Sequence, residues 1–564
     1  MKKQILKFFK GDVDDSEETL IKYSHDASLL EVRPKFVLFP KDSEDVKNLV
    51  AWVEEAKKDN PQLSITCRCA GTDMSGGAIG ESIILDFTRY MNKLVGGPLP
   101  LKTKANWEIA VEPGMFYRDF EKITLKKGLI LPCFTASKSI NAMGGMFGNN
   151  SAGERTLKYG KMEDYILSSK VVFTDGREYT VKPLNKEELE KKIAQNDFEG
   201  NVYKNIFNLI KENEDEINEA KPKVHKNSAG YYLWNVMQNG FFDLNKLLVG
   251  SQGTLGIITE MTLKIMPDIK HSKLVVIFLN DLAPLGRLVD EILTLNPETL
   301  EAYDDKTMRL AVKFFPEFLK NKGFTGMLKF MWSFLPEAFM MATGGFPKLI
   351  ILAEFAGDNE KVVNDKCLKL LEKIKDFKLK VHITASEIEA NKYWDIRRES
   401  FALLRKHVKG MRTAPFIDDI IVRPEFLPKF LPELNKILGQ YKSKMMYTLA
   451  GHAGEGNFHI IPLMDFKRKD TAQIILESGE KVYDLVMKYR GSITAEHNDG
   501  LIRTPYLEKM YGYRIIEIFR KIKETFDSQN IFNPGKKVPS VREGGTKEYI
   551  ALHIAVEHTA KHGS

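Results

Sequence analysis

Two histidines lie near the ends of one glycine-rich run, Gly451-His-Ala-Gly-Glu-Gly-Asn-Phe-His459. Because they flank a turn, His452 and His459 could face one point, and Glu496 in the later run Ala495-Glu-His-Asn-Asp-Gly500 would complete the set. Two imidazole nitrogens and one carboxylate oxygen suit Zn, Mn or Fe, with positions left open for a substrate. The alternative is that these are ordinary turn and core residues. Two of only 11 histidines fall in this run and a Glu–His pair follows, which favours a metal site.

Three glycine clusters in the N-terminal half indicate a second kind of site. They read Arg68-Cys-Ala-Gly-Thr-Asp-Met-Ser-Gly-Gly-Ala78, Gly144-Gly-Met-Phe-Gly-Asn-Asn-Ser-Ala-Gly153 and Gly250-Ser-Gln-Gly-Thr-Leu-Gly-Ile-Ile258. Glycine lets the backbone approach a ligand closely, and successive N–H groups form concave anion sites that suit a pyrophosphate. None of the three is a Rossmann fingerprint or a P-loop, and one such stretch alone is weak evidence. The prediction of a cofactor site depends on finding three of them, each beside a predicted strand.

The order and the amino-acid sequences of these clusters resemble those of the FAD-linked oxidase family, whose FAD domain is like that of vanillyl-alcohol oxidase. That family reads Arg-Gly-Gly-Gly-Thr-Ser with a Ser-Gly-Gly, then Gly-Gly…Asn-x-x-Gly, then Gly-Ser-Glu-Gly-Thr-Leu-Gly-Ile-Ile-Thr. The third cluster matches through Thr259 with Gln252 in place of Glu. In the first cluster, Cys69 and Ala70 replace two glycines and Asp73 replaces Ser.

The resemblance implies an FAD site. No histidine lies near residues 68–80, where some relatives attach the flavin covalently, so we expect FAD to be held non-covalently. The expected cofactor-binding residues are Arg68, Gly71, Thr72, Ser75, Gly76, Gly77, Gly144, Gly145, Asn149, Ser151, Gly153, Gly250, Gly253, Thr254, Gly256, Ile257 and Ile258.

The resemblance extends to the C-terminal half. The family includes D-lactate dehydrogenases, D-2-hydroxyglutarate dehydrogenases and glycolate oxidase FAD subunits, and carries Gly-His-x-Gly-Asp-Gly-Asn-x-His and a later Glu-His-Gly. This chain has Glu455 where Asp is usual and Asn498 where Gly is usual. The resemblance implies that His452, His459 and Glu496 bind a divalent metal and that His497 is the catalytic base.

These roles suit the oxidation of a 2-hydroxy acid, with a small D-lactate-like acid as the expected substrate. A metal lowers the pKa of the substrate hydroxyl, a neutral histidine takes its proton, and flavin accepts the hydride. The substrate carboxylate needs a cation, ideally a bidentate arginine. In the helical run Trp394-Asp-Ile-Arg-Arg398, Arg397 is the candidate and Arg398 the reserve, since relatives have Trp-x-x-Arg here. The alternative is a surface helix arginine.

Two other functions stay open. A transferase of the alkyl-glycerone-phosphate synthase type uses a similar FAD domain, but such relatives have His-His-Gly where this chain has Glu496 and His497. An FAD subunit that only carries electrons would not need a substrate site, and an intact metal triad argues against it.

The elements that must position these residues are of mixed type. Apolar runs bounded by turn residues predict strands at 82–85, 108–114, 168–176 and 246–250, while three- and four-residue apolar spacing predicts helices over 45–58 and 115–128. Strand–helix units follow at 273–293 and 349–375, which predict a sheet covered on one face, and a helix is expected over 507–526.

We therefore expect an α+β protein. The resemblance implies a two-part FAD-binding domain of the PCMH type over 1–270 and a ferredoxin-like α+β substrate or cap domain with the metal site over 271–500. A C-terminal helical segment over 501–564 then packs back on the FAD domain, and its Asn533-Pro-Gly-Lys536 resembles the family's closing motif.

Composition limits the partners. The net charge of +7 comes without clustered lysines, arginines and aromatics, so we expect no nucleic acid. The four cysteines form no CxxC pair, which excludes an iron–sulfur cluster of this chain's own. A quinone, a cytochrome, an iron–sulfur protein or O2 is left as the electron acceptor.

The location follows from the absence of targeting signals. The N-terminus is not a signal peptide, and no apolar window is long enough to cross a membrane, so we expect a cytoplasmic protein. Residues 313–346 are dense in Phe, Met and Trp with interspersed lysines. They are interpreted as a peripheral contact with the inner face of the membrane or, alternatively, as a cap packed on the core or on a second subunit.

Overall fold

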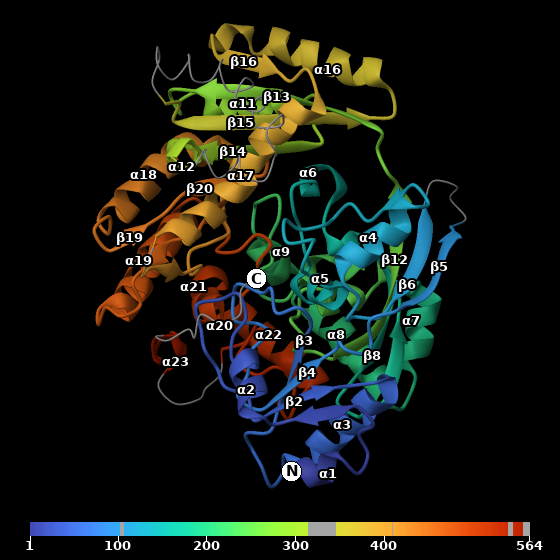
Figure 1. Ribbon diagram of the computed structural model, residues 1–564. Helices are drawn as coiled ribbons and strands as arrows, with labels where there is room; N and C mark the ends of the chain where they lie inside the picture. Colours follow the sequence, from blue (N-terminus) through green and yellow to red (C-terminus); the bar gives the residue numbers. More distant parts are fainter. Residues whose placement is uncertain (102–105, 314–345, 409, 540–544, 556–564) are drawn as a thin grey trace.

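The computed structural model describes residues 1–101, 106–313, 346–408, 410–539 and 545–555 (Figure 1). In this part of the chain, two sheets of the N-terminal half lie in the lower body of Figure 1, and one larger sheet lies above them. The C-terminal helices, drawn in red, lie against the lower body.

The first sheet has four strands in the order β1-β2-β4-β3. Its strands are β1 (Asp12–Asp14), β2 (Phe36–Phe39), β4 (Ile83–Asp86) and β3 (Ile65–Arg68). The last three are parallel to one another, as βαβ connections require. Helix α3 (Ser43–Ala56) begins where the Asp42 side chain accepts a hydrogen bond from the Asp45 amide, and it buries the apolar stripe predicted from the sequence.

The second sheet is antiparallel, in the order β5-β6-β12-β8-β9. Its strands are β5 (Leu94–Pro100), β6 (Trp107–Val111), β12 (Ile257–Pro267), β8 (Ile166–Val172) and β9 (Glu178–Val181). The second glycine cluster forms helix α5 (Met143–Asn149), and the predicted helix at 115–128 is α4 (Tyr117–Leu125). The predicted strand at 246–250 is wrong, because these residues form helix α10 (Asn245–Leu248). An apolar run of that length does not distinguish a strand from one helical turn.

The third sheet has seven strands in the order β16-β13-β15-β14-β20-β21-β18. Its strands are β13 (His271–Leu279), β14 (Thr299–Asp304), β15 (Leu349–Gly357), β16 (Lys380–Ile383), β18 (Ile420–Ile421), β20 (Leu449–His452) and β21 (Asn457–Ile460). The first four, with helices α11 (Leu285–Leu293) and α16 (Glu360–Lys373), form the βαββαβ arrangement of a ferredoxin-like unit. Strands β20 and β21 extend it.

Helices cover both faces of this sheet, so the expectation of one covered face is wrong. On β13, Val275 and Ile277 share a core with α11 and α16, whereas Leu274 and Val276 share one with Trp394 of α17 (Glu387–His407). Every residue of β13 from 274 to 279 is therefore buried. Helix α17 lies between the sheet and the lower body in Figure 1, where it can reach a site between them.

The C-terminal part returns to the first sheet. The predicted helix at 507–526 is divided into α21 (Leu507–Tyr511) and α22 (Tyr513–Phe526), because Gly512 has a positive φ of 80°. Phe532 then pairs with Ile65, and the side-chain Nδ2 of Asn533 donates to the backbone carbonyl oxygens of Gly77 and Gln252.

Residues 314–345, which make up nearly all of the aromatic segment, lie outside the described residues. Among the helices of the described part, none combines the length and the apolar character that crossing a bilayer requires.

Candidate active site

One cavity of about 470 Å³ joins the glycine clusters to the histidine run. Its wall includes residues of all three clusters, and also His452, His459, Glu496 and His497. A cavity of this size is typical of a ligand site, and segments more than 400 residues apart line it.

The predicted cofactor residues fall into two groups. Those that line the cavity are Arg68, Gly71, Thr72, Gly77, Gly144, Gly145, Asn149, Ser151, Gly153, Gly253, Gly256 and Ile258. Those outside its lining are Ser75, Gly76, Gly250, Thr254 and Ile257.

The backbone at Gly145 leaves open space in the cavity wall. A Cβ atom added there would meet no atom within 4 Å, so any side chain at this position would enter the volume available to a cofactor. Position 153 requires glycine for a different reason, since a Cβ atom there would lie 2.1 Å from the carbonyl oxygen of Phe134. Burial raises the pKa of the Cys69 thiol well above its usual range, which makes this cavity-lining cysteine a poor nucleophile.

Asp73 joins the three glycine clusters. Its Oδ2 accepts hydrogen bonds from the amides of Ser75 and Gly77, at 2.9 and 2.7 Å, and from the Ser75 hydroxyl. Its Oδ1 accepts from Asn149 Nδ2 at 2.9 Å and from Gln252 Nε2 at 3.4 Å. The backbone amides of Ser75 and Gly77 and the Ser75 hydroxyl, at two positions expected to bind the cofactor, thus hold the Asp73 carboxylate.

The two histidines of the glycine-rich run come from a hairpin. His452 ends β20, Asn457 begins the antiparallel β21, and the two are paired. The turn between them packs too tightly for a side chain at Gly456, whose Cβ would lie 1.8 Å from the carbonyl oxygen of Val422. His452 and His459 therefore lie on adjacent strands, with ring centroids 5.2 Å apart.

Asp419 holds the loop that carries Glu496 and His497. Its Oδ2 accepts hydrogen bonds from the amides of Ala495, Glu496 and His497 at 2.7–2.8 Å, and from the Thr494 hydroxyl. Its Oδ1 accepts from Asn457 Nδ2 at 3.0 Å, which ties the loop to β21. Asp419 lies close enough to His459, Glu496 and His497 for a shared ion, but five donors already occupy its oxygens. We therefore interpret Asp419 as scaffold, not as a ligand.

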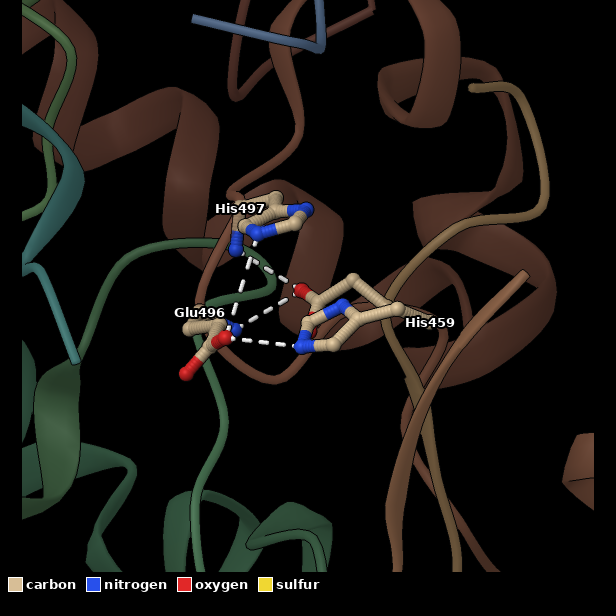
Figure 2. Close-up of side chains that lie close together, drawn as sticks. His459, Glu496 and His497 are labelled. Atoms are coloured by element: carbon tan, nitrogen blue, oxygen red, sulfur yellow. Dashed lines mark hydrogen bonds and ion pairs between the residues drawn. The ribbon is translucent and has the colours of Figure 1, made fainter. Parts of the chain in front are cut away.

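Glu496 Oε1 is the point at which the three histidines converge, and Figure 2 shows two of them, His459 and His497, beside Glu496. It lies 3.2 Å from Nε2 of His452, 3.1 Å from Nε2 of His459 and 3.8 Å from Nε2 of His497. His459 approaches from a strand, whereas Glu496 and His497 come from one loop.

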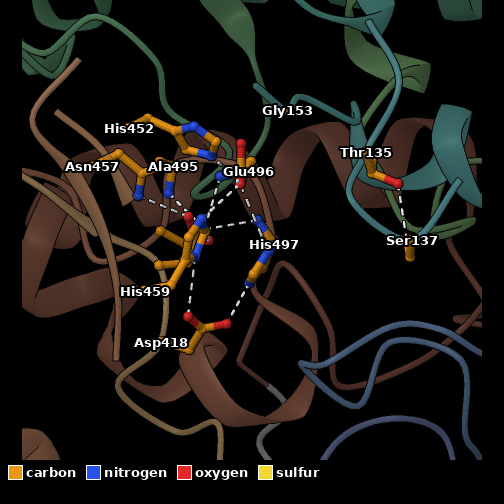
Figure 3. A network of polar contacts seen from close by, with 12 residues as sticks. Thr135, Ser137, Gly153, Asp418, His452, Asn457, His459, Ala495, Glu496 and His497 are labelled. Atoms are coloured by element: carbon orange, nitrogen blue, oxygen red, sulfur yellow. Dashed lines mark hydrogen bonds and ion pairs between the residues drawn. The ribbon is translucent and has the colours of Figure 1, made fainter. Parts of the chain in front are cut away.

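Each histidine has a carboxylate at its Nδ1, and Figure 3 shows Asp418 in this position for both His459 and His497. Asp418 Oδ1 lies 3.1 Å from Nδ1 of His459, and its Oδ2 lies 2.6 Å from Nδ1 of His497. Glu301 Oε1 lies 2.6 Å from Nδ1 of His452. Because an ionised carboxylate only accepts hydrogen bonds, each Nδ1 must carry a proton, and each Nε2 faces the cavity side.

Burial and charge oppose each other at these groups. Burial raises the pKa of the Asp418 carboxyl, but His497 and His459 hold it well below its usual range. Burial lowers the pKa of His459, but the Asp418 carboxylate and Glu496 raise it to about 10.

The donor set fits a metal ion. With Nδ1 protonated, the Nε2 lone pairs of His452 and His459 face Glu496 Oε1 at 3.2 and 3.1 Å, so three electron-pair donors gather at one point. Such donors repel one another unless a cation lies among them. The raised pKa of His459 reflects the same demand, which a proton or a divalent ion satisfies.

A buried lysine holds the other side of Glu496. Lys226 Nζ donates to Glu496 Oε2 at 2.9 Å and lies 2.8 Å from Glu455 Oε2. His225 Nδ1 lies 3.0 Å from Glu455 Oε1. Because Lys226 takes Oε2, only Oε1 of Glu496 is presented to the histidines.

Arg397 lines the cavity and is not a surface residue, since its side chain is 7% exposed. Its NH1 donates to Glu154 Oε1 at 3.3 Å, and its NH2 forms an ion pair with Glu301. Its Nε is buried and has no hydrogen-bond partner among the described residues. Arg398 also lines the cavity but is half exposed.

Family models match most of the chain. The model for the FAD binding domain matches residues 34–182, and the model for the C-terminal domain of FAD linked oxidases matches residues 269–537. The chain belongs to the FAD-linked oxidase family. The predicted family, the α+β fold with a PCMH-type FAD-binding domain, and the FAD-linked oxidoreductase class are thereby confirmed.

Characterised FAD-linked oxidases resemble this chain at about a quarter identity. D-2-hydroxyglutarate dehydrogenase of Pseudomonas putida is 26% identical over 94% of this chain and 50% of its own length. The glycolate oxidase subunit GlcD of Bacillus subtilis is 25% identical over 93% of both chains, and the mitochondrial D-lactate dehydrogenase [cytochrome] of Kluyveromyces lactis is 24% identical over 93% of this chain and 77% of its own. The chain spans about half the length of the D-2-hydroxyglutarate dehydrogenases it matches.

Solved structures of other proteins share the fold. An alkyldihydroxyacetonephosphate synthase superposes with a TM-score of 0.66 at 17% identity, covering 95% of this chain and 85% of the other. A p-cresol methylhydroxylase with substrate bound gives 0.63 at 15% identity, covering 94% and 95%. At this identity the likeness establishes the fold alone.

Sequence reasoning missed the acids that orient this family member's site. The sequence did give a signal that Glu301 is functional, because this acid lies inside the buried strand β14. Asp418 and Asp419 form an acidic pair after Phe416 and Ile417, but nothing in the sequence connects them with histidines 40 to 80 residues away.

Proposed function

We propose that this protein oxidises a small D-2-hydroxy acid, D-lactate or a close relative, to the 2-oxo acid with FAD as the hydride acceptor. The observation that carries the proposal is the shared cavity, whose wall includes both the glycine clusters and the three histidines with Glu496. A binding module or an electron carrier does not need a polarised carboxylate–histidine set in the same cavity as its cofactor.

The glycine clusters would hold the FAD. When bound, FAD supplies the acceptor for the hydride that leaves the substrate Cα. Gly145 leaves room for it, and Arg68 offers a cation in the first cluster. Attachment is proposed to be non-covalent, since the buried Cys69 thiol has a raised pKa.

His452, His459 and Glu496 would hold a divalent metal, with Zn, Mn or Fe as candidates. When bound, the metal supplies a Lewis acid that lowers the pKa of the substrate hydroxyl. Glu301 and Asp418 fix the tautomers of the two histidines, and Lys226 limits Glu496 to one ligand oxygen.

His497 is proposed as the catalytic base. Asp418 fixes its proton on Nδ1, so the Nε2 lone pair is available to take the hydroxyl proton. Arg397 would bind the substrate carboxylate, because it lies in the cavity wall with an unpaired buried Nε. The electron acceptor that reoxidises the flavin is proposed to be a quinone, a cytochrome or an iron–sulfur protein.

We propose three parts, residues 1–270, 271–500 and 501–564. The strands of the first two sheets end at Pro267, and those of the third begin at His271, which supports the first boundary. Helix α20 (Gly500–Arg503) begins the segment that returns to the first sheet, which supports the second.

The test is an anaerobic titration of the purified flavoprotein. D-lactate, L-lactate, glycolate and D-2-hydroxyglutarate are added in turn while the flavin absorbance is recorded, before and after EDTA treatment and metal restoration. Bleaching by one acid that EDTA abolishes and metal restores is the expected result. Glu496→Gln should behave like the EDTA-treated enzyme, whereas Glu389→Gln, which changes a glutamate paired with His382 outside the cavity, should not. A flavin that no acid bleaches would contradict the proposal and favour the transferase or carrier alternative.

A further inference from the structure

Glu154 is an acid in the wall of the cavity. It follows Gly153, whose backbone packs against the carbonyl oxygen of Phe134 so closely that a side chain at position 153 would not fit. This contact fixes the backbone next to Glu154. The Glu154 side chain is 8% exposed and lines the same cavity as His452 and Glu496.

Both cavity arginines bind Glu154. Arg398 forms a two-pronged pair, with Nε 2.9 Å from Oε1 and NH2 2.5 Å from Oε2. Arg397 NH1 donates to the same Oε1 at 3.3 Å. Burial raises the pKa of the Glu154 carboxyl, but the two arginines lower it below its usual value, so it is ionised at neutral pH.

The charges of the two cavity arginines are therefore matched before any substrate enters. Arg397 is shared between Glu154 and Glu301, and both prongs of Arg398 are taken by Glu154. Among the described residues that line the cavity there is no lysine, and the one other arginine, Arg68, belongs to the first glycine cluster.

A substrate with one carboxylate and a substrate with two would meet this wall differently. The first carboxylate can approach Arg397, which forms part of the cavity wall. A second carboxylate would find Arg398 neutralised and would face the Glu154 carboxylate itself. An unpaired charge opposite a like charge is a strong means of rejecting a ligand.

We propose that Glu154 is a specificity-determining residue that restricts the site to 2-hydroxy acids with a single carboxylate. The inference rests on the proposed function and adds to it the charge class of the substrate. Glu154 excludes dicarboxylates in two ways, by occupying Arg398 and by adding a negative charge to the wall.

A purely structural role for Glu154 makes a different prediction. If Glu154 only held Arg397 in place, its loss would lower kcat/KM for all hydroxy acids by a similar factor. The two roles are separated by the ratio of kcat/KM for a dicarboxylate to kcat/KM for a hydroxy acid with an uncharged side chain.

The experiment compares wild type, Glu154→Gln and Glu154→Ser as holoenzymes, with D-2-hydroxybutyrate, D-malate and D-2-hydroxyglutarate as substrates. Glu298→Gln is the matched control, because Glu298 is a buried glutamate paired with Lys158 outside the cavity lining. In both Glu154 variants, the ratio of kcat/KM for the dicarboxylates to that for 2-hydroxybutyrate should rise about tenfold or more, and it should not move in the control. The Kd of the oxidised enzyme for oxaloacetate, relative to 2-oxobutyrate, should fall in the same variants, as read from the flavin spectrum.

Three results would overturn the inference. One is a wild type that oxidises the dicarboxylates as efficiently as 2-hydroxybutyrate. Another is a pair of Glu154 variants in which both the kcat/KM ratio and the relative Kd are unchanged. In either case the proposed function stands, because hydroxy acids still bleach the flavin. If no hydroxy acid bleaches the wild-type flavin, the proposed function fails and this inference fails with it.

Discussion

Oδ2 of Asp418 lies 2.6 Å from Nδ1 of His497, and this contact decides which ring nitrogen of the histidine faces the cavity. The other oxygen of the same carboxylate orients His459 at 3.1 Å. One buried side chain thus sets the tautomers of the proposed base and of a proposed metal ligand.

Asp418→Asn should therefore impair catalysis more than folding. The two histidines face different oxygens of Asp418, and in asparagine one of these becomes an NH2 group that can only donate, so one histidine must change its tautomer. We expect kcat to fall by roughly 10²-fold or more, with FAD content unchanged. Steady-state kinetics and the flavin absorbance ratio measure both, with the exposed Asp484→Asn as control. Full activity in Asp418→Asn would contradict the assignment of His497 as the base.

The Asp73–Gln252 contact predicts that the negative charge at position 73 can be moved to position 252, but that two negative charges cannot be accommodated together. Gln252→Glu would bring a second carboxylate near Asp73 Oδ1 and remove the donor that Gln252 Nε2 provides to Asn149 and Ser75. We expect weaker FAD binding and lower thermal stability in this variant. Asp73→Asn combined with Gln252→Glu should recover both, with a coupling energy of about 1–3 kcal/mol.

FAD titration followed by flavin fluorescence tests this exchange. Asp119→Asn, at an exposed position on α4, is the control. Strictly additive effects of the two substitutions would show that the two side chains do not act as a pair.

Lys226 predicts a large effect on stability. It is buried between Glu455 and Glu496, so Lys226→Met leaves two buried carboxylates without their shared partner. We expect a loss of about 3–5 kcal/mol in the free energy of unfolding, measured by denaturant titration. Adding Glu455→Gln should restore part of it, because one of the unpaired charges is removed. A loss below about 1 kcal/mol would mean that the surroundings compensate the charges in another way.

Glu354 on β15 predicts a pH dependence of stability. Burial raises its pKa to about 7, with further contributions from Glu298 and Glu154, while Arg155 opposes them. Because the folded-state pKa exceeds the unfolded value, the folded protein holds the proton more tightly. The stabilisation from this group is full below about pH 4.5 and is lost as pH rises toward 7.

Glu354→Gln should therefore stabilise the protein above pH 7, by roughly 3 kcal/mol at most, and change little near pH 4.5. Thermal unfolding at a series of pH values measures this difference. A constant difference between wild type and variant across that range would show that Glu354 is already ionised in the folded state.

The sequence by itself determined the residue types of the site and the local turns and strands that carry them. The glycine-rich turn that joins His452 to His459, the three glycine clusters and the Glu496–His497 pair are all local features, because turn formation and strand periodicity depend on near neighbours. The ferredoxin-like unit was expected from the family resemblance, whereas the strand–helix order by itself predicted only a sheet covered on one face. The short run at 246–250 did not, since a few apolar residues fit either a strand or a helix.

Only the tertiary structure decided how these residues act together. Which acid stands behind which histidine depends on contacts between strands and loops far apart in the chain, as in the pairing of Glu301 with His452 and of Lys226 with Glu496. The same holds for Glu154, which directly follows the second glycine cluster. Its role depends on contacts with Arg397 and Arg398, more than 240 residues away in the chain. Sequence spacing carries no information on such contacts, because burial and charge pairing are set by the packing of the whole fold.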